Sequence, residues 1–176
     1  LRLENVHIDS IAPGAPTVLT DVAGDNFLST GRIALSHDTR DSSFLPTQGH
    51  LVEASYEQGF GDFNYPRFEL TGSQFFTVYE RPDGRGKHIL QLRGQAGWTG
   101  DDTPIFERFF AGGFQSFRGF EFRGVTPREA NTKVGGQTML LGTAEYIIPI
   151  TADDNVRGVV FSDFGTVEPD ASLDQF

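Results

Sequence analysis

The sequence predicts an all-β fold of about seven strands joined by turns, and three observations indicate it. Apolar and polar residues alternate along several runs of the chain, which is the two-residue period of a strand. Gly, Pro, Asp and Asn gather between these runs, where a chain reverses direction. No run of about 18 apolar residues is present, so a transmembrane helix is excluded.

The N-terminal third shows the weakest pattern. Residues 1–11 alternate poorly and predict a first strand, and residues 12–25, rich in Pro, Gly and Ala, predict a long loop after it. The pattern sharpens from Gly31, where one face of the next strand carries Ile33, Leu35 and His37. A turn over residues 38–49 then leads to a strand in which Val52, Ala54 and Tyr56 alternate with Glu53, Ser55 and Glu57.

Two further strands follow in the middle of the chain. Residues 64–79 alternate, with a break expected at Gln74 and Phe75. A turn at residues 81–86 leads to a strand that carries apolar residues on one face and polar residues on the other: Leu90, Leu92, Ala96 and Trp98 against Gln91, Arg93 and Gln95.

The last two strands lie near the C-terminus. Residues 137–149 alternate, with Thr143 and Glu145 on the polar face, and a turn at residues 151–155 leads to a strand over residues 156–167 that carries Asp163. Each strand is close to the ~9–11 residues that cross a bilayer at a tilt. A soluble sandwich and a membrane barrel both fit this pattern and the mean hydropathy of −0.29.

Residues 107–125, ERFFAGGFQSFRGFEFRGV, follow neither period. Six phenylalanines interleaved with glycines predict an ordered loop whose aromatic rings are buried, since each buried ring stabilises by roughly 1.5–3 kcal/mol. Arg118 lies among these rings. A buried guanidinium needs a carboxylate partner, and Asp163 and Glu145 both stand on polar faces of the strands after the loop.

Composition limits the function. The net charge of −10 repels phosphate and excludes nucleic acid as a partner, and the absence of Cys excludes disulfides and thiolate zinc sites. Residues 118–125 look superficially like an RNA-binding octamer, but Glu121 stands where that octamer needs Gly or Ala. No nucleophile, oxyanion hole or phosphate loop is recognisable, so we expect neither an enzyme nor a cofactor.

Three motifs, in order along the chain, resemble those of the bacterial surface antigen family, the outer-membrane assembly barrels of BamA type. Phe117-Arg118-Gly119-Phe120 is similar to the family's Val-Arg-Gly-Phe loop, although its first position differs. Asp38, Arg40 and Asp41 followed by Pro46 and Gly49 resemble the family's Asp-x-Arg-Asp…Pro-x-x-Gly hairpin, and residues 161–165 resemble its Phe-x-Asp-x-Gly strand.

The resemblance implies a fold. It implies an antiparallel membrane β-barrel of which about 7–8 strands are present here, a sector of a larger, 16-stranded barrel. Residues 1–176 would be part of the C-terminal barrel domain, with loop 101–136 folded into the lumen. We take the chain, which begins at Leu1 without Met, to be a piece of a longer protein whose signal peptide and periplasmic modules lie upstream.

The resemblance also implies a function without catalysis. The chain would assemble and insert proteins in the bacterial outer membrane, with the lipid bilayer and unfolded outer-membrane client proteins as partners and with possible accessory assembly lipoproteins. Two alternatives stay open: a secretion transporter or pore of the same superfamily, and a soluble β-barrel that binds a small apolar ligand.

The resemblance favours Asp163 as the partner of Arg118, with Glu145 second, in a lock of the loop to the inner wall that includes Gly119 and Phe120. In the hairpin motif we expect Asp38 and Asp41 to accept backbone N–H bonds and Gly49 to adopt a glycine-specific conformation; a metal site with His37 is the less favoured reading. We also expect Tyr56, Tyr79, Trp98 and Tyr146 near strand ends in an aromatic girdle.

Overall fold

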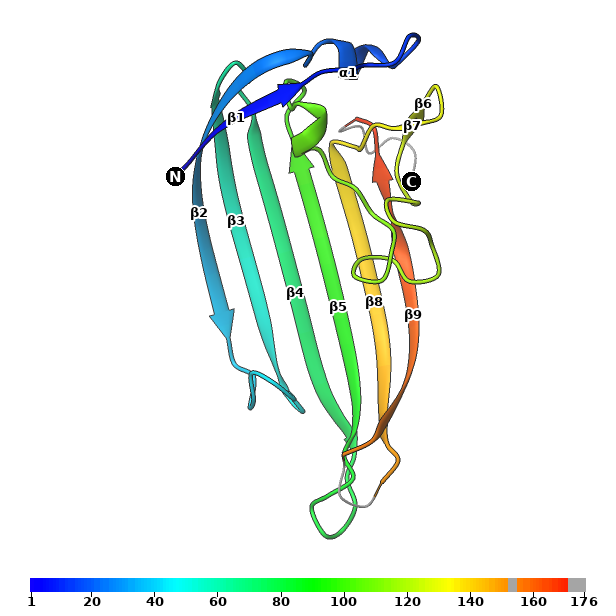
Figure 1. Cartoon of the computed structure of the whole chain (residues 1–176). Helices are drawn as coiled ribbons and strands as arrows, with labels where there is room; N and C mark the ends of the chain where they lie inside the picture. The colour runs from blue at the N-terminus through cyan, green and yellow to red at the C-terminus, as the bar shows by residue number, and fades with distance from the viewer. Residues whose placement is uncertain (152–154, 171–176) are drawn as a thin grey trace.

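The described residues form an open antiparallel sheet of seven strands and a separate small two-stranded sheet (Figure 1). The computed structural model describes residues 1–151 and 155–170. In sheet order the strands are β1 (Arg2–Ile8), β2 (Gly24–Asp38), β3 (Gly49–Gly61), β4 (Pro66–Tyr79), β5 (His88–Thr99), β8 (Thr138–Pro149) and β9 (Arg157–Glu168). Strands β1 and β9 are the two edges, and they do not pair with each other. The prediction of an all-β antiparallel sheet is confirmed, and within this chain the sheet does not close.

Several boundaries differ from the prediction. Strand β2 begins at Gly24 rather than Gly31, because β1 pairs with its first part from Gly24 to Thr30. The loop between them holds a single helical turn, α1 (Thr17–Thr20). Three short elements lie between β5 and β8: η1 (Ile105–Glu107), β6 (Arg128–Glu129) and β7 (Thr132–Lys133). The turn expected at 151–155 lies partly outside the described residues.

Neither of the two helical elements in the described part of the chain is long and apolar enough to span a membrane.

Strand β4 pairs regularly across the break in alternation noted at Gln74 and Phe75, and its backbone irregularity lies further along. Pairing with β5 continues through Gln74, opposite Leu92, and Phe75, opposite Gln91, so the two faces still alternate there. The register shifts between Thr77 and Tyr79 instead. This bulge inserts one extra residue and lets Tyr79 lie opposite His88 and pack against its ring. The break in alternation at Gln74 and Phe75 is therefore one of residue type and not of backbone: Phe75 is an apolar residue on the polar face, where it is 6% exposed.

The outer face of the sheet is apolar and uncovered. Register places Ile33 opposite Tyr56, Tyr56 opposite Phe68, and Phe68 opposite Trp98, so large apolar side chains form rows across neighbouring strands. Strands β2, β3, β4, β5 and β8 all contribute exposed residues to this face. Among these residues, with their exposed fractions, are Ile33 (70%), Leu35 (74%), Phe68 (48%), Leu70 (50%), Phe76 (46%), Leu92 (43%) and Leu140 (51%). So extensive an exposed apolar surface needs an apolar environment outside the sheet.

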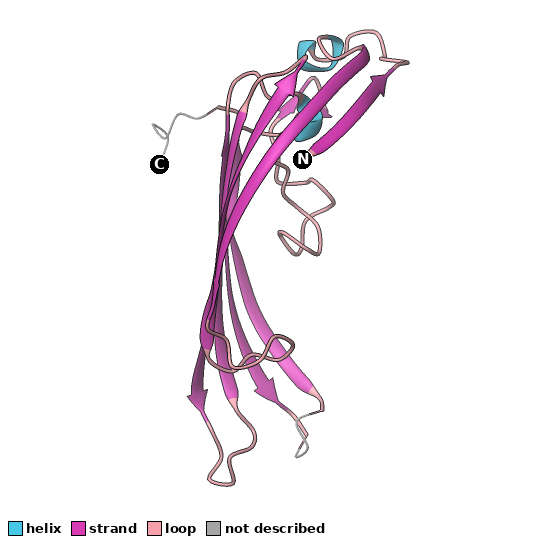
Figure 2. Cartoon of the chain, turned by 90° about the vertical axis from the view of Figure 1, so that its left-hand side faces the viewer, coloured by secondary structure: helices cyan, strands magenta, loops and turns pink. Residues whose placement is uncertain are grey.

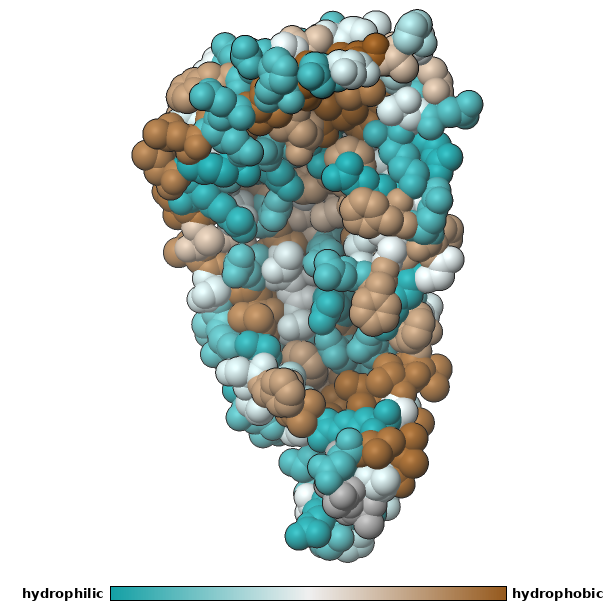
Figure 3. Space-filling model, viewed as in Figure 1, coloured by the Kyte–Doolittle hydropathy of each residue, from teal (hydrophilic) through white to brown (hydrophobic). Residues whose placement is uncertain are grey.

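The inner face is polar and carries the loop between β5 and β8. The loop and β1 lie on the same side of the sheet (Figure 2). Hydrophilic side chains occupy much of this face, with hydrophobic ones interspersed (Figure 3). One apolar cluster joins the loop to β8 and β9 and contains Phe109, Ala111, Phe117, Leu141 and Val167. The part of the chain between β5 and β8 is therefore packed onto the inner wall.

The expectation that all six phenylalanines of the loop are buried was wrong. Phe109 and Phe117 are buried and Phe110 is half-buried, but three rings are largely exposed: Phe114 (88%), Phe120 (53%) and Phe122 (73%). The physical reason is that the open sheet covers the loop from one side only. The exposed rings have no second wall to pack against.

The four residues of the expected aromatic girdle fall into two groups on the outer face. Tyr56 and Trp98 flank Phe68, with ring centroids 4.7 and 5.8 Å from it, toward the end of the sheet that carries the loop. Tyr79 and Tyr146 flank His88 at the opposite end, with centroid distances of 5.2 and 5.8 Å. A role for these two groups at the membrane interfaces stays a prediction.

Gly97 tests how the loop packs on the wall. A Cβ at Gly97 would meet the Phe109 ring, with Cζ at 2.6 Å, whereas a Cβ at Gly94 of the same strand would meet nothing within 4 Å. We expect Gly97→Ala to lower the free energy of unfolding by about 1–3 kcal/mol through overpacking, and Gly94→Ala to cost clearly less. Denaturant unfolding of both variants measures this, and equal losses would contradict the packing described.

Candidate functional site

The central contact of the loop is made by Arg118, whose guanidinium lies between two strands. Its Nε and Nη2 donate to the two oxygens of Asp163 on β9, at 2.8 and 2.6 Å. Its Nη1 donates to Oε1 of Glu145 on β8 at 2.6 Å, and its backbone N–H donates to Asp163 Oδ2 at 3.0 Å. The sequence left a choice between the two carboxylates, and the guanidinium contacts both.

The surroundings keep this contact largely out of water. The Asp163 side chain is 5% exposed, and those of Arg118 and Glu145 are 22% and 20% exposed. Thr143 Oγ1 donates to Asp163 Oδ1 at 3.0 Å, and the guanidinium carbon lies 3.6 Å from the centroid of the Phe161 ring. The hydrogen bonds that Arg118 donates to Asp163, followed by the one it donates to Glu145, raise the pKa of Arg118 against the opposing effect of burial. The arginine is therefore held as a cation by charge, hydrogen bonds and an aromatic face.

The sequence placed Thr143 on the polar face and Phe161 in the Phe-x-Asp-x-Gly motif, but assigned neither residue to the Arg118 contact. Each stands two residues before a carboxylate already recognised, Glu145 and Asp163, and so shares its face of the strand. The two-residue period was the signal that could have found them.

A tight turn presents Arg118 to the wall. Gly113 and Phe117 exchange backbone hydrogen bonds of 3.1 and 3.0 Å, and Ser116 Oγ accepts from the Gly112 N–H at 3.0 Å. Phe117 is buried in the apolar cluster, which fixes the residue next to Arg118. Gly119, with φ of +86°, then turns the chain back over the wall.

Phe120 has a limited part in this arrangement. Its ring packs edge-on against Phe117, with centroids 5.0 Å apart, but it is 53% exposed. The Phe120 ring covers one side of Phe117. The described contacts include none between Phe120 and Asp163 or Glu145.

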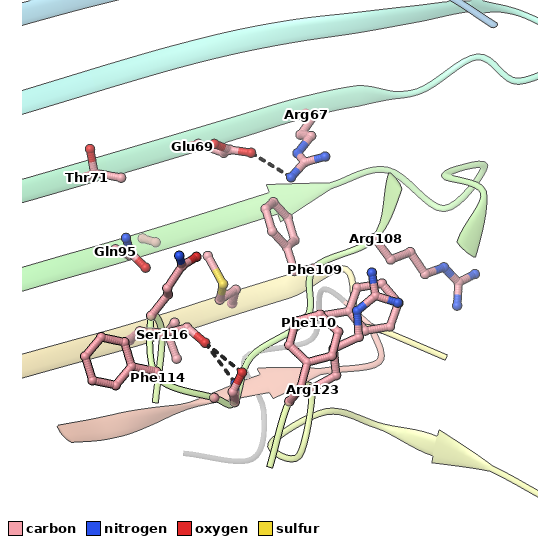
Figure 4. A pocket seen from close by; sticks show the side chains of 17 residues that line it. Arg67, Glu69, Thr71, Gln95, Arg108, Phe109, Phe110, Phe114, Ser116 and Arg123 are labelled. Carbon is pink, nitrogen blue, oxygen red and sulfur yellow. Dashed lines mark hydrogen bonds and ion pairs between the residues drawn. The ribbon is translucent and has the colours of Figure 1, made fainter. Parts of the chain in front are cut away.

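A cleft of about 720 Å³ opens between the loop and the inner wall (Figure 4). Polar side chains of β4 and β5, including Glu69 and Gln95, line one side, and Phe110 and Phe114 of the loop line the other. The Arg123 guanidinium carbon lies 4.0 Å from the Phe110 ring centroid. The loop thus has an apolar and cationic surface that faces the polar wall.

The hairpin motif lies at the other end of the sheet from the loop (Figure 1), so the structure does not bring the two motifs together. Asp38 accepts two side-chain bonds from Arg40, at 2.9 and 2.8 Å, and one from its backbone N–H at 3.0 Å. These bonds raise the pKa of Arg40. This is turn chemistry, since both Asp38 oxygens are engaged within the hairpin.

Asp41 holds the returning arm of the hairpin. Its carboxylate accepts from the backbone N–H and hydroxyl of Thr47, at 2.8 and 2.6 Å, and from the N–H of Gln48 at 3.2 Å. These bonds, with the Thr47 hydroxyl first, lower the pKa of Asp41 to about 2. Pro46, directly before Thr47, is half-buried.

Gly49 begins β3 with φ of +92°, the left-handed conformation that glycine adopts without strain. A Cβ there would also collide with the carbonyl of Thr39, whose carbon would lie 2.8 Å away. His37, considered as a metal ligand, points its Nδ1 toward His50 Nε2 at 3.0 Å and not toward the Asp38–Arg40 pair.

Known proteins resemble this chain in sequence over most of its length. The sequence model of the Omp85 superfamily domain matches residues 2–174. The chain is 30% identical over 172 residues to "Outer membrane protein assembly factor BamA" of Nitratidesulfovibrio vulgaris, covering 93% of this chain and 21% of that protein. It is 27% identical to the protein of the same name in Neisseria meningitidis serogroup B, covering 92% and 21%. The chain thus spans about a fifth of the length of these curated relatives.

A solved structure supports the fold. The crystal structure of BamA from Haemophilus ducreyi lacking POTRA domains 1–3 superposes with a TM-score of 0.68, at 21% identity, over 81% of this chain and 30% of that one. At this identity the likeness establishes the fold alone.

Arg118→Ala tests the loop contact. It leaves Asp163 and Glu145 without their shared cation, so we expect a loss of up to about 3 kcal/mol in the free energy of unfolding, the lower end of the range for a broken buried pair, because the guanidinium is partly exposed. The matched control is Arg128→Ala, which removes an exposed pair with Glu121 and should cost about 1 kcal/mol or less. Equal losses in denaturant unfolding would show that the Arg118 contact contributes no more than a surface pair.

Asp41 makes the hairpin pH-dependent. Its pKa is depressed in the folded state, so the stabilisation it supplies is present above its ordinary value of 3.8 and is lost as the pH falls from 3.8 to about 2. We expect the NMR shift of the Thr47 amide to titrate near pH 2 and this titration to be absent in Asp41→Asn. A midpoint at 3.8 or above would contradict the hydrogen bonds described.

Proposed function

The chain belongs to the Omp85 superfamily, and on that premise we propose that it forms part of the membrane barrel of a factor that assembles outer-membrane proteins. The observation that carries the proposal is the likeness, over nearly the whole chain, to bacterial proteins named outer membrane protein assembly factor. The chain would act in the bacterial outer membrane, with residues 1–176 as a sector of the C-terminal barrel domain and with periplasmic modules upstream.

The two faces of the sheet suit this role. The apolar outer face would contact the lipid bilayer, and the polar inner face, with loop 101–136 packed on it, would line the lumen. A soluble ligand-binding barrel would instead turn its apolar face inward, and here that face lies on the side away from the loop. This observation favours the membrane sector over the soluble alternative.

Client assembly in this proposal uses backbone pairing. A strand edge that is not fully paired offers N–H and C=O groups to an incoming unfolded client, which adds its strands by β-augmentation. No covalent bond is made or broken, so we propose no catalytic residue and no cofactor. Accessory assembly lipoproteins would bind outside the lumen, at the periplasmic side.

The Arg118 contact would supply rigidity during this exchange. By joining the loop to β8 and β9 through Glu145 and Asp163, it would brace the inner wall while strands elsewhere in the barrel separate. Gly119 and Phe120 would set the path of the loop, and the Asp38–Gly49 hairpin would keep β2 and β3 in register at the other end.

The test is reconstitution. The full-length protein that contains this chain is placed in phospholipid vesicles, a denatured outer-membrane β-barrel is added, and client folding is followed by heat-modifiable mobility on gels. We expect faster folding than in empty vesicles, slower folding with Arg118→Ala, and an unchanged rate with Arg128→Ala.

Two outcomes would overturn the proposal. Client that enters the vesicle interior unfolded and protected from protease would identify a secretion transporter of the same superfamily. A client folding rate equal to that in empty vesicles would contradict the proposed assembly function itself.

A further inference from the structure

Glu107, at the start of the loop, contacts two arginines from strands that are not neighbours. Its Oε2 lies 3.3 Å from Nη1 of Arg67 on β4, and its Oε1 is in close contact with Nη2 of Arg2 on β1. Arg67 Nη1 also donates to the Glu107 carbonyl oxygen at 3.0 Å. The Glu107 side chain is only 11% exposed, so these two cations offset the cost of burying its carboxylate.

The segment around Glu107 is fixed by packing on both sides. Ile105, two residues earlier in η1, is buried in a cluster with Val22 and Val134. Phe109, two residues later, packs on Gly97 and lies under Arg67, whose guanidinium carbon is 4.5 Å from the ring centroid. The carboxylate position is therefore defined by the chain before and after it.

The charges around this contact balance. A small cavity of about 140 Å³ beside Glu107 is lined by Ser55 and six charged residues: Arg2, Arg32 and Arg67, with Glu57, Glu69 and Glu107. Three arginines against three glutamates leave no net charge, so the charges that line this cavity are balanced within the chain.

The contact spans a large part of the sheet. Strands β1 and β4 are separated by β2 and β3, three inter-strand spacings or about 14 Å along the sheet. One carboxylate reaches arginines on both because the sheet curves and β1 leans toward the loop side, as Figure 2 shows. In the described chain the backbone of β1 pairs with β2, and two side-chain contacts link β1 to the loop: the Arg2–Glu107 pair, and Ile8, which packs against the cluster that contains Ile105.

We propose that Glu107 is a second anchor of the loop: a positioning residue that ties the loop to edge strand β1 and to β4, and so holds the curvature of the sheet from the inside. Arg118 joins the loop to β8 and β9 at the opposite edge. With both anchors the loop connects the two edges of the sheet across its concave face. The inference rests on the contacts alone and does not depend on the assembly function.

The test is hydrogen exchange by mass spectrometry on the full-length protein in lipid nanodiscs. Glu107→Gln removes the charge and keeps the size, and we expect faster exchange in β1 and in residues 101–110, with β8 and β9 unchanged. Arg118→Ala should give the reverse pattern, with faster exchange in residues 112–125 and unchanged exchange in β1.

The matched control is Glu4→Gln. Glu4 is the other carboxylate partner of Arg2, at 3.4 Å, but it lies on β1 itself and is exposed, so its loss should leave exchange in β1 unchanged. Protection of β1 that survives Glu107→Gln, or that falls equally in Glu4→Gln, would overturn the proposal. A variant that exchanges faster everywhere would also overturn it, because an anchor of β1 acts locally.

Discussion

A cation that is held among aromatic rings and away from bulk water needs carboxylate partners to offset the cost of its burial. This need for an ion pair determines how the loop packs on the inner side of the sheet. Arg118 meets it with Asp163 and Glu145, which come from two different strands. The loop therefore cannot move away from the wall without separating charges that are mostly desolvated. Phe117, buried beside the arginine, adds apolar contact to the same point, so the ionic and the apolar contributions act together.

The sheet and the Arg118 contact could be predicted because each follows from a local rule. Alternation at period two marked the faces, and a buried guanidinium implied a partner on the polar face of a nearby strand. The start of β2 at Gly24 could not be predicted, since residues 24–30 alternate weakly and are ordered by pairing with β1. The contacts of Glu107 could not be predicted from the sequence. The curvature of the whole sheet brings Arg2 and Arg67 close to it, and no local sequence pattern encodes that curvature.

The loop shows that composition does not predict which aromatic rings are buried when the number of surrounding packing surfaces is unknown. Its rings were expected to be buried together, yet Phe109 and Phe117 are buried against the wall while Phe114 and Phe122 are largely exposed. The apolar outer face shows the same dependence on context. A pattern of alternating residues fits a sandwich as well as a barrel sector, and only the side on which the loop packs, together with the relatives, distinguishes the two.

The two anchors of the loop differ in how far apart along the chain their partners lie. Arg118 and Asp163 are 45 residues apart, whereas Arg2 and Glu107 are 105 apart. Closing the longer segment costs more chain entropy, but both of its partners precede the loop tip in the sequence. Glu107 and its two arginines all lie within residues 2–107, so this anchor uses strands that come before the loop, whereas the Arg118 anchor uses β8 and β9, which come after it.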